Sequence, residues 1–513
     1  MAPSLVIALI ALLAVAATAC RGGDSARVTP TPAGPGASPT QPTPTHTPSG
    51  SETAATPAPL PDRIRINPDN PRYFSWRGET ILPIGATESG PESCENANGW
   101  LAISSGFDWQ PDLENLLAHG GNFVRVLPYF PGHPIQPWQA DQDGQYDLSR
   151  INPEWTQRLE AYLAWTEAND IVVLLEVFDN WSFVNDRDGA WQDNPWHPEN
   201  NVNYDDDTVS GSTTRDDAAI YRAFTEGKAE LAPLLEQYVS ALLDVALPHG
   251  NVIYNVSNES NAPLAWSEHF AGVIRRIAGE RGLDVLVGEM PHAFDPSTGL
   301  GPIAAGSAFD YVDAASQTSD DVFGDSEAAE VAGTDDVMTR LRNDTGKPVT
   351  IGKIYYRSPA TLWSKFINGA AAVRYHRNCD RGGSDEANPQ AYFDYVRHLR
   401  TFTDEIDLAS ASSTDDGLAS DVTPGIRADV LAAPGLWYAV YLYREAGDPA
   451  TPAQVSLALD AAAYNARWFN PATGEWLAAP GNVVDAAPVA KTLFTTPSFE
   501  SNLVLLVQVT DGR

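Results

Sequence analysis

Residues 251–261 read NVIYNVSNESN, a β-branched and aromatic run that turns polar ahead of Pro263. The run predicts a buried strand, and Pro263 stands where a helix can begin. Glu259 therefore lies at the carboxyl end of the predicted strand. Side chains at such ends form the site in barrels of parallel strands, so this carboxylate is a candidate for proton transfer. The alternative that this pattern leaves open is a solvent-exposed loop glutamate.

Predicted strands and helices alternate along most of the chain. The strands are nearly continuous apolar runs, which is typical of parallel sheets buried on both faces. Besides the strand before Glu259, they cover residues 81–86, 122–127, 171–178, 284–287, 309–314, 348–353 and 370–376. Predicted helices cover residues 109–119, 154–168 and 218–247. This alternation predicts an α/β fold, a (β/α)8 or TIM barrel, over residues 63–409.

The C-terminal part of the chain has a different rhythm. Short alternating strands separated by Gly, Pro, Asn and Asp are typical of an antiparallel β-sandwich. They are predicted at residues 435–443, 455–459, 466–469, 491–494 and 503–509. A linker at residues 410–425 leads into this sandwich, which we place at residues 424–513.

The N-terminus has the pattern of an export signal. Residues 1–20 contain an apolar stretch of roughly 13–15 residues that ends in small residues, which is the pattern of an export signal and not of a spanning helix. Residues 17–20, ATAC, resemble a bacterial lipobox, which implies a lipid on Cys20 and a location at the bacterial cell surface. A plain secretory signal is the alternative. Residues 21–62 are rich in Pro, Thr and Ser and predict a disordered tether.

The charge of the chain limits its partners. Lys and Arg number 32 against 67 Asp and Glu, which gives a net charge of −35. Such a field repels nucleic acids and anionic lipid headgroups, so we expect no nucleic-acid partner and no membrane contact besides the lipid anchor. Neutral glycans are compatible with this charge. No metal-ligand spacing or nucleotide fingerprint stands out in the sequence, so we expect no metal and no cofactor. We also expect the protein to be a monomer.

Several short motifs together resemble clan A glycoside hydrolases, the cellulase-like and apiosidase-like barrels. They are NPRYF (70–74), NFVRV (122–126), SNES (257–260), YH (375–376) and ARWFNPATGEW (466–476). The last motif resembles the collagen-binding-type β-domain that accompanies such barrels, for which we expect a structural role. The resemblance implies hydrolysis of a glycosidic bond, with Asn258 beside Glu259 and with Glu259 as general acid/base.

Four further residues are candidates for substrate binding. In the resemblance, an Arg near the end of the second strand supports the catalytic carboxylates, and Arg125 matches that place. A buried charge there needs a carboxylate partner, unless the side chain reaches the rim. Trp181 offers an indole face on which a sugar ring can stack, although packing is the alternative. Asp179 and His376 complete the predicted substrate-binding residues.

The sequence departs from the family at the second carboxylate. The nucleophile of clan A is a Glu at the end of the seventh strand, where KPVTIGKIYY places Lys353. A lysine offers no carboxylate to form a glycosyl-enzyme, and its charge favours an ionised Glu259, which is the wrong state for an acid. The chemistry has therefore either moved to another carboxylate or been lost.

Glu289, at the end of the strand after that of Glu259, is the first candidate for a relocated nucleophile, with His292 close by in the sequence. Glu176 and Asp179 end the preceding strand and are further candidates. The alternative for Glu289 is a structural ion pair with Lys353 or Arg374. Two functions follow: a surface-tethered glycoside hydrolase, or a non-catalytic glycan-binding lipoprotein on a degenerate hydrolase barrel.

Two cysteines remain besides Cys20. Cys94 follows the first predicted barrel strand and Cys379 follows the last. Closure of a barrel makes these two loops neighbours, and export permits oxidation. We therefore predict a disulfide between Cys94 and Cys379, with two free thiols as the alternative.

Overall fold

The computed structural model describes residues 62–86, 101–185, 189–214, 217–291, 306, 308–315, 326–376, 391–414, 417–445, 447, 449–477, 483–485 and 491–510. Residues 59–513 make up one compact unit. The predicted signal, tether and lipidation site at Cys20 lie outside the described residues, as do Cys94, Cys379 and His292.

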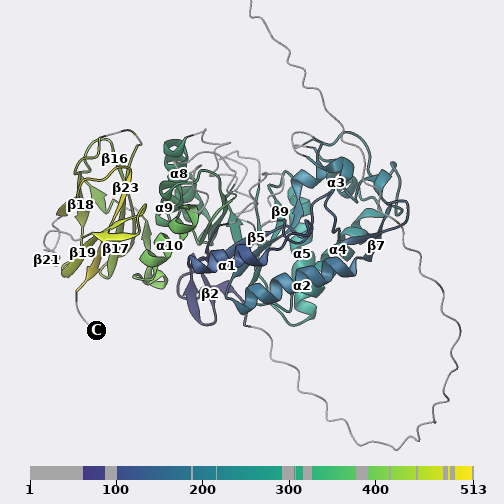
Figure 1. Ribbon diagram of the computed structural model, residues 1–513, viewed down its shortest axis with the longest axis horizontal. Helices are drawn as coiled ribbons and strands as arrows, with labels where there is room; N and C mark the ends of the chain where they lie inside the picture. The colour runs from purple at the N-terminus through teal and green to yellow at the C-terminus, as the bar shows by residue number, and fades with distance from the viewer. Residues whose placement is uncertain are drawn as a thin grey trace, which may run out of the picture. The chain divides into compact units, whose positions relative to one another are not determined.

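The core of the molecule is a closed barrel of parallel strands (Figure 1). In barrel order the strands are β10 (Val287–Glu289), β11 (Tyr311–Asp313), β12 (Val349–Ile354), β13 (Ala372–Tyr375), β4 (Ile84–Gly85), β5 (Phe123–Val126), β8 (Val172–Asp179) and β9 (Val252–Asn258). Each of them falls on a strand predicted from the sequence. Every residue of β8 and β9 is buried, as the apolar runs predict for strands covered on both faces. The (β/α)8 fold class is therefore confirmed.

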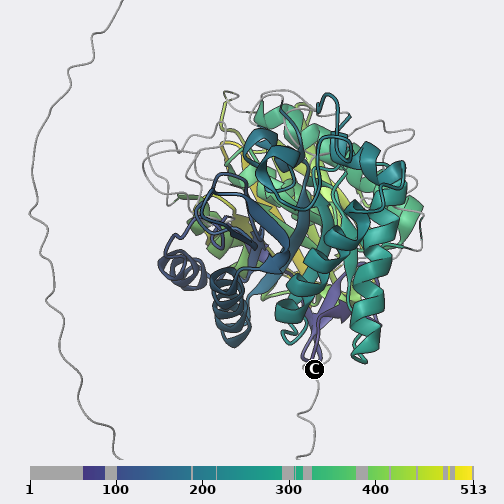
Figure 2. The same cartoon turned by 90° about the vertical axis from the view of Figure 1, so that its right-hand side faces the viewer.

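Helices cover the outside of the barrel strands (Figures 1 and 2). Those described are α1 (Gln110–Ala118), α2 (Pro153–Ala168), α3 (Ala219–Thr225), α4 (Leu231–Ala246), α5 (Leu264–Glu280), α8 (Glu327–Thr345), α9 (Pro359–Ile367) and α10 (Ala391–Thr403). Local sequence determines where several of these helices begin. Asn152 caps α2 by accepting a hydrogen bond from the Glu154 amide, with Pro153 in the first turn.

The single helix predicted at residues 218–247 is wrong, because two helices cover that stretch. Helix α3 ends at Thr225 and α4 begins at Leu231. Gly227 between them adopts a left-handed φ of +73°, and the Lys228 amide donates to the Ala223 carbonyl oxygen. Such a glycine terminates a helix, because only glycine adopts this conformation without a steric cost.

The C-terminal strands form two antiparallel sheets, as predicted. The larger holds β14 (Ser413–Thr414), β16 (Ile426–Ala433), β17 (Trp437–Arg444), β23 (Asn502–Val509), β19 (Ala463–Asn470), β20 (Glu475–Leu477) and β21 (Val483–Asp485). The smaller holds β15 (Ala419–Ser420), β18 (Gln454–Ala458) and β22 (Lys491–Thr495). Strands β14 and β15 come from the predicted linker. One face of the larger sheet packs on the barrel, where the Tyr441 hydroxyl donates to the Ala360 carbonyl oxygen of α9.

Two small sheets accompany the barrel. One comprises β1 (Arg65–Ile66), β2 (Phe74–Trp76) and β3 (Glu79–Ile81), and the other pairs β6 (Trp138–Ala140) with β7 (Tyr146–Ile151). The described 3-10 helices are η2 (Asn180–Phe183), η3 (Trp191–Asp193), η4 (Pro198–Asn200) and η6 (Leu408–Ser410). Within the described ranges, no helix has the length and apolar character needed to cross a membrane.

Candidate functional site

Glu259 follows the last residue of β9, at the carboxyl end of a barrel strand where the sequence places it. Its backbone has a left-handed φ of +46°, an unusual conformation for a residue other than glycine. The next residue restores pairing, because the Ser260 amide donates to the Met290 carbonyl oxygen at 2.8 Å. Backbone strain of this kind occurs at sites where the surrounding structure fixes one side chain in place.

Within the described part of the chain, the side chains of Lys353, Trp181 and Tyr355 donate hydrogen bonds to the Glu259 carboxylate. Lys353 donates its ammonium group to Oε1, and Trp181 donates its indole N–H to Oε2. The Tyr355 hydroxyl donates to Oε1 at 2.8 Å. Donors around a carboxylate stabilise its ionised form, and an ammonium group does so most strongly. A general acid must instead hold a proton that it can give away.

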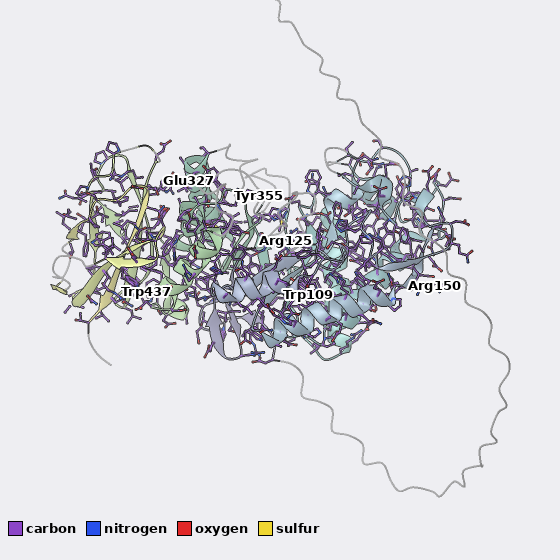
Figure 3. The ribbon with its side chains drawn as sticks, in the orientation of Figure 1. Trp109, Arg125, Arg150, Glu327, Tyr355 and Trp437 are labelled. Atoms are coloured by element: carbon purple, nitrogen blue, oxygen red, sulfur yellow. The ribbon has the colours of Figure 1, made fainter. Side chains whose placement is uncertain are left out.

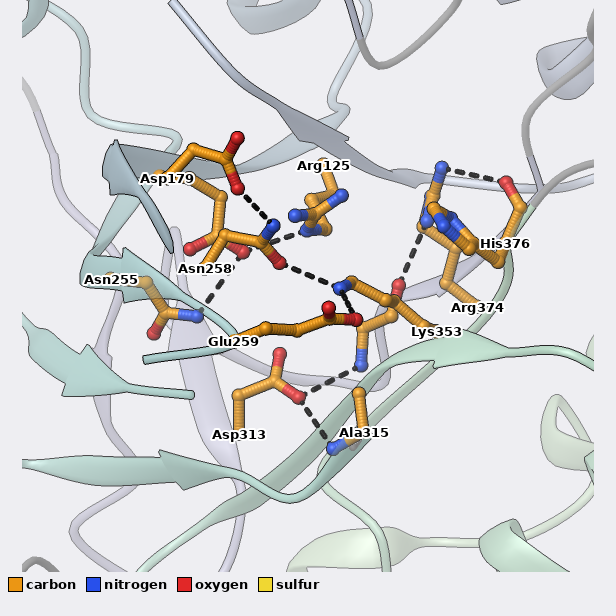
Figure 4. A network of polar contacts seen from close by, with 12 residues as sticks. Arg125, Asp179, Asn255, Asn258, Glu259, Asp313, Ala315, Lys353, Arg374 and His376 are labelled. Atoms are coloured by element: carbon orange, nitrogen blue, oxygen red, sulfur yellow. Dashed lines mark hydrogen bonds and ion pairs between the residues drawn. The ribbon is translucent and has the colours of Figure 1, made fainter. Parts of the chain in front are cut away.

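The side chain of Lys353 lies inside the barrel, with its ammonium group beside Glu259. Its side chain is 2% exposed, and its Nζ also donates to Asn258 Oδ1 at 2.6 Å (Figure 4). Burial lowers the pKa of Lys353, whereas the Glu259 charge opposes that shift. The seventh strand thus has the register that the sequence predicts, and the position expected to carry a nucleophile carries the counter-ion of Glu259.

Asp179 links the ends of β8 and β9. Its Oδ1 accepts from Asn258 Nδ2 at 2.6 Å (Figure 4). Its Oδ2 accepts from the Ser182 hydroxyl at 2.8 Å. Asp179 is also the N-cap of η2, the turn that carries Trp181. Burial raises the pKa of Asp179, although both of these hydrogen bonds act against the shift. One carboxylate therefore positions both Asn258 and Trp181 around Glu259.

Arg125 lies deeper in the barrel and pairs with Glu176. The Arg125 Nε donates to Glu176 Oε1 at 2.7 Å, and neither side chain has any exposed surface. This is the carboxylate partner that a charge on β5 requires. Asn255 Nδ2 donates to the same oxygen at 3.4 Å. Arg125 and Tyr355 are both labelled within the barrel in Figure 3.

Glu289 ends β10 but is fully buried. Burial raises the pKa of its carboxyl group well above the usual range, against the opposing effect of the Ser260 and Ser267 hydroxyls. A neutral carboxyl group without accessible surface is poorly suited to attack a sugar. Nor is an ion pair of Glu289 with Lys353 or Arg374 observed, since Lys353 pairs with Glu259 and Arg374 donates to backbone oxygens.

His376 and Arg374 lie at the end of β13, on the far side of Lys353 (Figure 4). Arg374 donates to the Gly352 carbonyl oxygen at 2.8 Å and to the His376 carbonyl oxygen at 3.2 Å. The His376 ring packs edge-on against Tyr355, with ring centroids 5.1 Å apart. His376 therefore contacts one of the three groups that hold Glu259.

Tyr355 and Asp313 belong to this network but were not predicted from the sequence. Tyr355 stands two positions after Lys353, and side chains two apart in a strand share a face, so strand periodicity could have indicated it. Asp313, on β11, is fully buried and accepts from the Ala315 amide at 2.9 Å and the Gly352 amide at 3.3 Å. Burial and the nearby Glu176 charge raise the pKa of Asp313 to about 6.

No group of three or more His, Cys, Asp or Glu side chains suited to a metal ion occurs among the residues described. The polar network instead consists of charged pairs and amides within hydrogen-bonding distance. Its accessible parts are Trp181 and Tyr355, which are partly exposed, whereas the carboxylate they hold is 9% exposed.

This barrel is similar in fold to solved structures of glycoside hydrolases. A family model described as a domain of unknown function, DUF6298, matches residues 136–290. Among curated proteins, none matches the sequence. A solved glycoside hydrolase aligns over 88% of this chain and 98% of its own, with 13% identity and a TM-score of 0.59.

Two further structures are similar. A candidate glycoside hydrolase from Bacteroides vulgatus aligns over 87% of this chain and 82% of its own, with 12% identity and a TM-score of 0.50. An endo-1,4-beta-mannanase from Rhizomucor miehei aligns over 66% of this chain and 99% of its own, with 14% identity and a TM-score of 0.47. The protein has the fold of glycoside hydrolase barrels, and at these identities the likeness concerns the fold alone.

Proposed function

We propose that this protein binds a glycan at the end of the barrel and does not cleave it by double displacement. The observation that carries the proposal is the Lys353 to Glu259 ion pair. Retaining hydrolysis needs two carboxyl groups roughly 5 Å apart, one of them a nucleophile and the other able to donate a proton. Here a cation occupies the position expected for one of them and pairs with the other.

The same groups are suited to holding a sugar. A carboxylate accepts hydrogen bonds from sugar hydroxyl groups, while an ammonium group and an amide donate to sugar oxygens. Glu259, Lys353 and Asn258 supply these groups together. Trp181 adds a partly exposed indole ring. Its N–H donates to Glu259, and this hydrogen bond fixes the orientation of the ring. The face of the ring is an apolar surface on which a pyranose can stack.

The test measures, by calorimetry, the binding of a panel of neutral soluble glycans to the ectodomain, which is the chain without its predicted signal at residues 1–20. Wild type should bind at least one of them, and Glu259→Gln should weaken that binding because the amide nitrogen meets the Lys353 ammonium group. The matched control is Glu330→Gln, which alters another buried Lys and Glu pair, Lys365 with Glu330 at 2.6 Å. Equal binding by wild type and Glu259→Gln would reject the site.

Hydrolysis by single displacement is the second candidate, and one observation favours it. Asp179 and Glu259 are two carboxyl groups at the ends of neighbouring barrel strands, and burial raises the pKa of Asp179. Inverting hydrolysis uses one carboxyl group as acid and a second as base. Such a reaction inverts the anomeric centre. Proton NMR of the first product formed would show the inverted anomer, and loss of turnover in Asp179→Asn would support this assignment.

We further propose that a lipid on Cys20 and the tether at residues 21–62 hold the protein at the bacterial surface. The support is the ATAC sequence ahead of a Pro-rich and Thr-rich stretch. Full-length protein made in a bacterial host should be found in the membrane fraction, and Cys20→Ser should be found in the soluble exported fraction. An unchanged distribution of Cys20→Ser would contradict the anchor.

A further inference from the structure

A cavity beside the Glu259 network has no role in the chemistry described so far. It has a volume of about 290 Å³ and lies between α3 and the loop that follows β9. Helix α3 itself packs on α4 and α5 (Figure 1). The lining includes Asp217, Tyr221, Arg222, Glu226, Asn261 and Pro263.

The cavity and the Glu259 site share two chain segments. Asn261 and Pro263 belong to the loop that begins at Glu259. On the other side, the Tyr221 hydroxyl donates to Asn180 Oδ1 at 3.2 Å, and Asn180 precedes Trp181, which contacts Glu259. The loop after β9 and the turn that carries Trp181 therefore connect the Glu259 site with the wall of the cavity.

Three of the lining side chains, those of Asp217, Tyr221 and Arg222, are held in place. Arg222 pairs with Asp217 at 2.6 Å and donates to the Ser212 carbonyl oxygen at 2.6 Å. Tyr221 packs edge-on against Trp266 with ring centroids 4.9 Å apart. Because these groups are already ordered, a ligand loses little side-chain freedom on binding.

The chemistry of the lining selects the class of ligand. Two carboxylates, one guanidinium group and one amide offer the planar polar groups that hydrogen-bond to neighbouring sugar hydroxyls, while Tyr221 and Pro263 supply apolar surface. The carboxylates outnumber the guanidinium group. Sugars with sulfate, phosphate or carboxylate groups would therefore be repelled, and neutral sugars would not.

We propose that this cavity is a second sugar subsite, which holds a neutral sugar residue of the same glycan whose neighbouring residue lies at Glu259. The inference rests on the proposed function and extends it from a single sugar site to an oligosaccharide. The protein thus discriminates chain length and charge at α3, separately from the contacts made at Glu259.

The test compares mannose, mannobiose and mannotetraose, with the glucose series in parallel, by calorimetry on the ectodomain. Wild type should bind the longest member of one series more tightly than its monosaccharide. Glu226→Ala should lower the affinity for the longest member about tenfold, the effect of one lost hydrogen bond to a charged group. The monosaccharide affinity should stay unchanged. Asn261→Ala should act in the same way from the opposite wall.

Glu268→Ala is the matched control, because it removes the same charge from an exposed position on α5 that does not line the cavity. A wild type that binds the monosaccharide as tightly as the longer members, or variants that weaken both equally, would overturn the subsite and leave the Glu259 site intact. Failure of wild type to bind any member of these series, together with failure on the whole panel of neutral glycans, would overturn both proposals.

Discussion

Lys353 Nζ forms an ion pair with Glu259 Oε1 across the end of the barrel, from the strand where clan A hydrolases are expected to carry their nucleophile. The two side chains are 2% and 9% exposed. A pair so well covered is costly to separate, since each charge would remain in a poorly solvated place without its partner.

The first prediction concerns this pair. Lys353→Met should lower the free energy of unfolding by about 3 to 5 kcal/mol, because Glu259 keeps its buried charge without a counter-ion. Adding Glu259→Gln should recover much of the loss, since it removes that charge. Urea denaturation of the two single variants and the double variant measures the coupling.

Lys365→Met provides the control for that experiment. Lys365 pairs with Glu330 between α9 and α8, and both side chains are buried. Its replacement should destabilise the protein to a similar degree while glycan affinity is unchanged. Loss of glycan binding in both lysine variants would mean that binding follows stability and not the Lys353 contact.

The second prediction concerns the neutral donors to Glu259. Tyr355→Phe and Trp181→Phe each remove one hydrogen bond to the carboxylate and keep an aromatic ring. Each should weaken glycan binding by about 1 to 3 kcal/mol, because the carboxylate becomes less well oriented. Calorimetry with the best ligand of the panel gives the values.

Tyr443→Phe is a control with the same chemistry at a distant place. The Tyr443 hydroxyl donates to Glu327 Oε1 at 3.2 Å, where β17 meets α8. Its loss should leave glycan affinity unchanged. An effect of Tyr443→Phe as large as that of Tyr355→Phe would show that the loss of binding does not come from the Glu259 contacts.

The third prediction is a pH dependence set by Asp313. Its pKa is raised from 3.8 to about 6 in the folded protein, mainly by burial, so the folded state holds a proton that the unfolded state releases. The resulting stability is fully present below pH 3.8 and is lost as the pH rises through 6. The loss amounts to about 3 kcal/mol.

Asp313→Asn should remove this contribution, because asparagine does not titrate and its oxygen can still accept from the backbone amides. Urea denaturation between the two pKa values and above them should show a smaller decline than in wild type. Asp143→Asn, on an exposed loop, serves as the control. Identical pH profiles for wild type and Asp313→Asn would mean that Asp313 does not titrate in this range.

The fourth prediction is the disulfide between Cys94 and Cys379. In Cys20→Ser protein exported by a bacterial host, the denatured chain should react with no thiol reagent until a reductant is added. Closing so long a loop should also stabilise the fold by about 5 kcal/mol through the entropy of the unfolded chain. Two reactive thiols without reductant would refute the pairing.

The sequence predicts the barrel because its strands are buried on both faces and therefore read as apolar runs. Each of the eight observed strands overlaps a predicted one, although β10 (Val287–Glu289) shares only Val287 with the strand predicted at residues 284–287. The break between α3 and α4 could have been predicted, because Gly227 lies within the polar run TEGKAE at residues 225–230 and a glycine there is a helix-ending signal.

The site is predictable only in part. Lys353 beside Glu259 follows from the register of β12, because strand ends meet at one edge of the barrel. The depth of a side chain is not visible in the sequence. Glu289 and Glu259 both end barrel strands, yet Glu289 is fully buried with a raised pKa, while Glu259 reaches three donors. That difference arises from packing across the barrel.

The central claim is that the Lys353 to Glu259 pair makes a binding site without double-displacement chemistry. The most direct measurement is release of new reducing ends from the tightest-binding glycan, with protein in excess over ligand so that a single cleavage per site is detected. We expect wild type to bind the glycan without releasing reducing ends, and we expect no release by Glu259→Gln, which binds more weakly. Release by wild type with retained anomeric configuration, abolished in Glu259→Gln, would contradict the account.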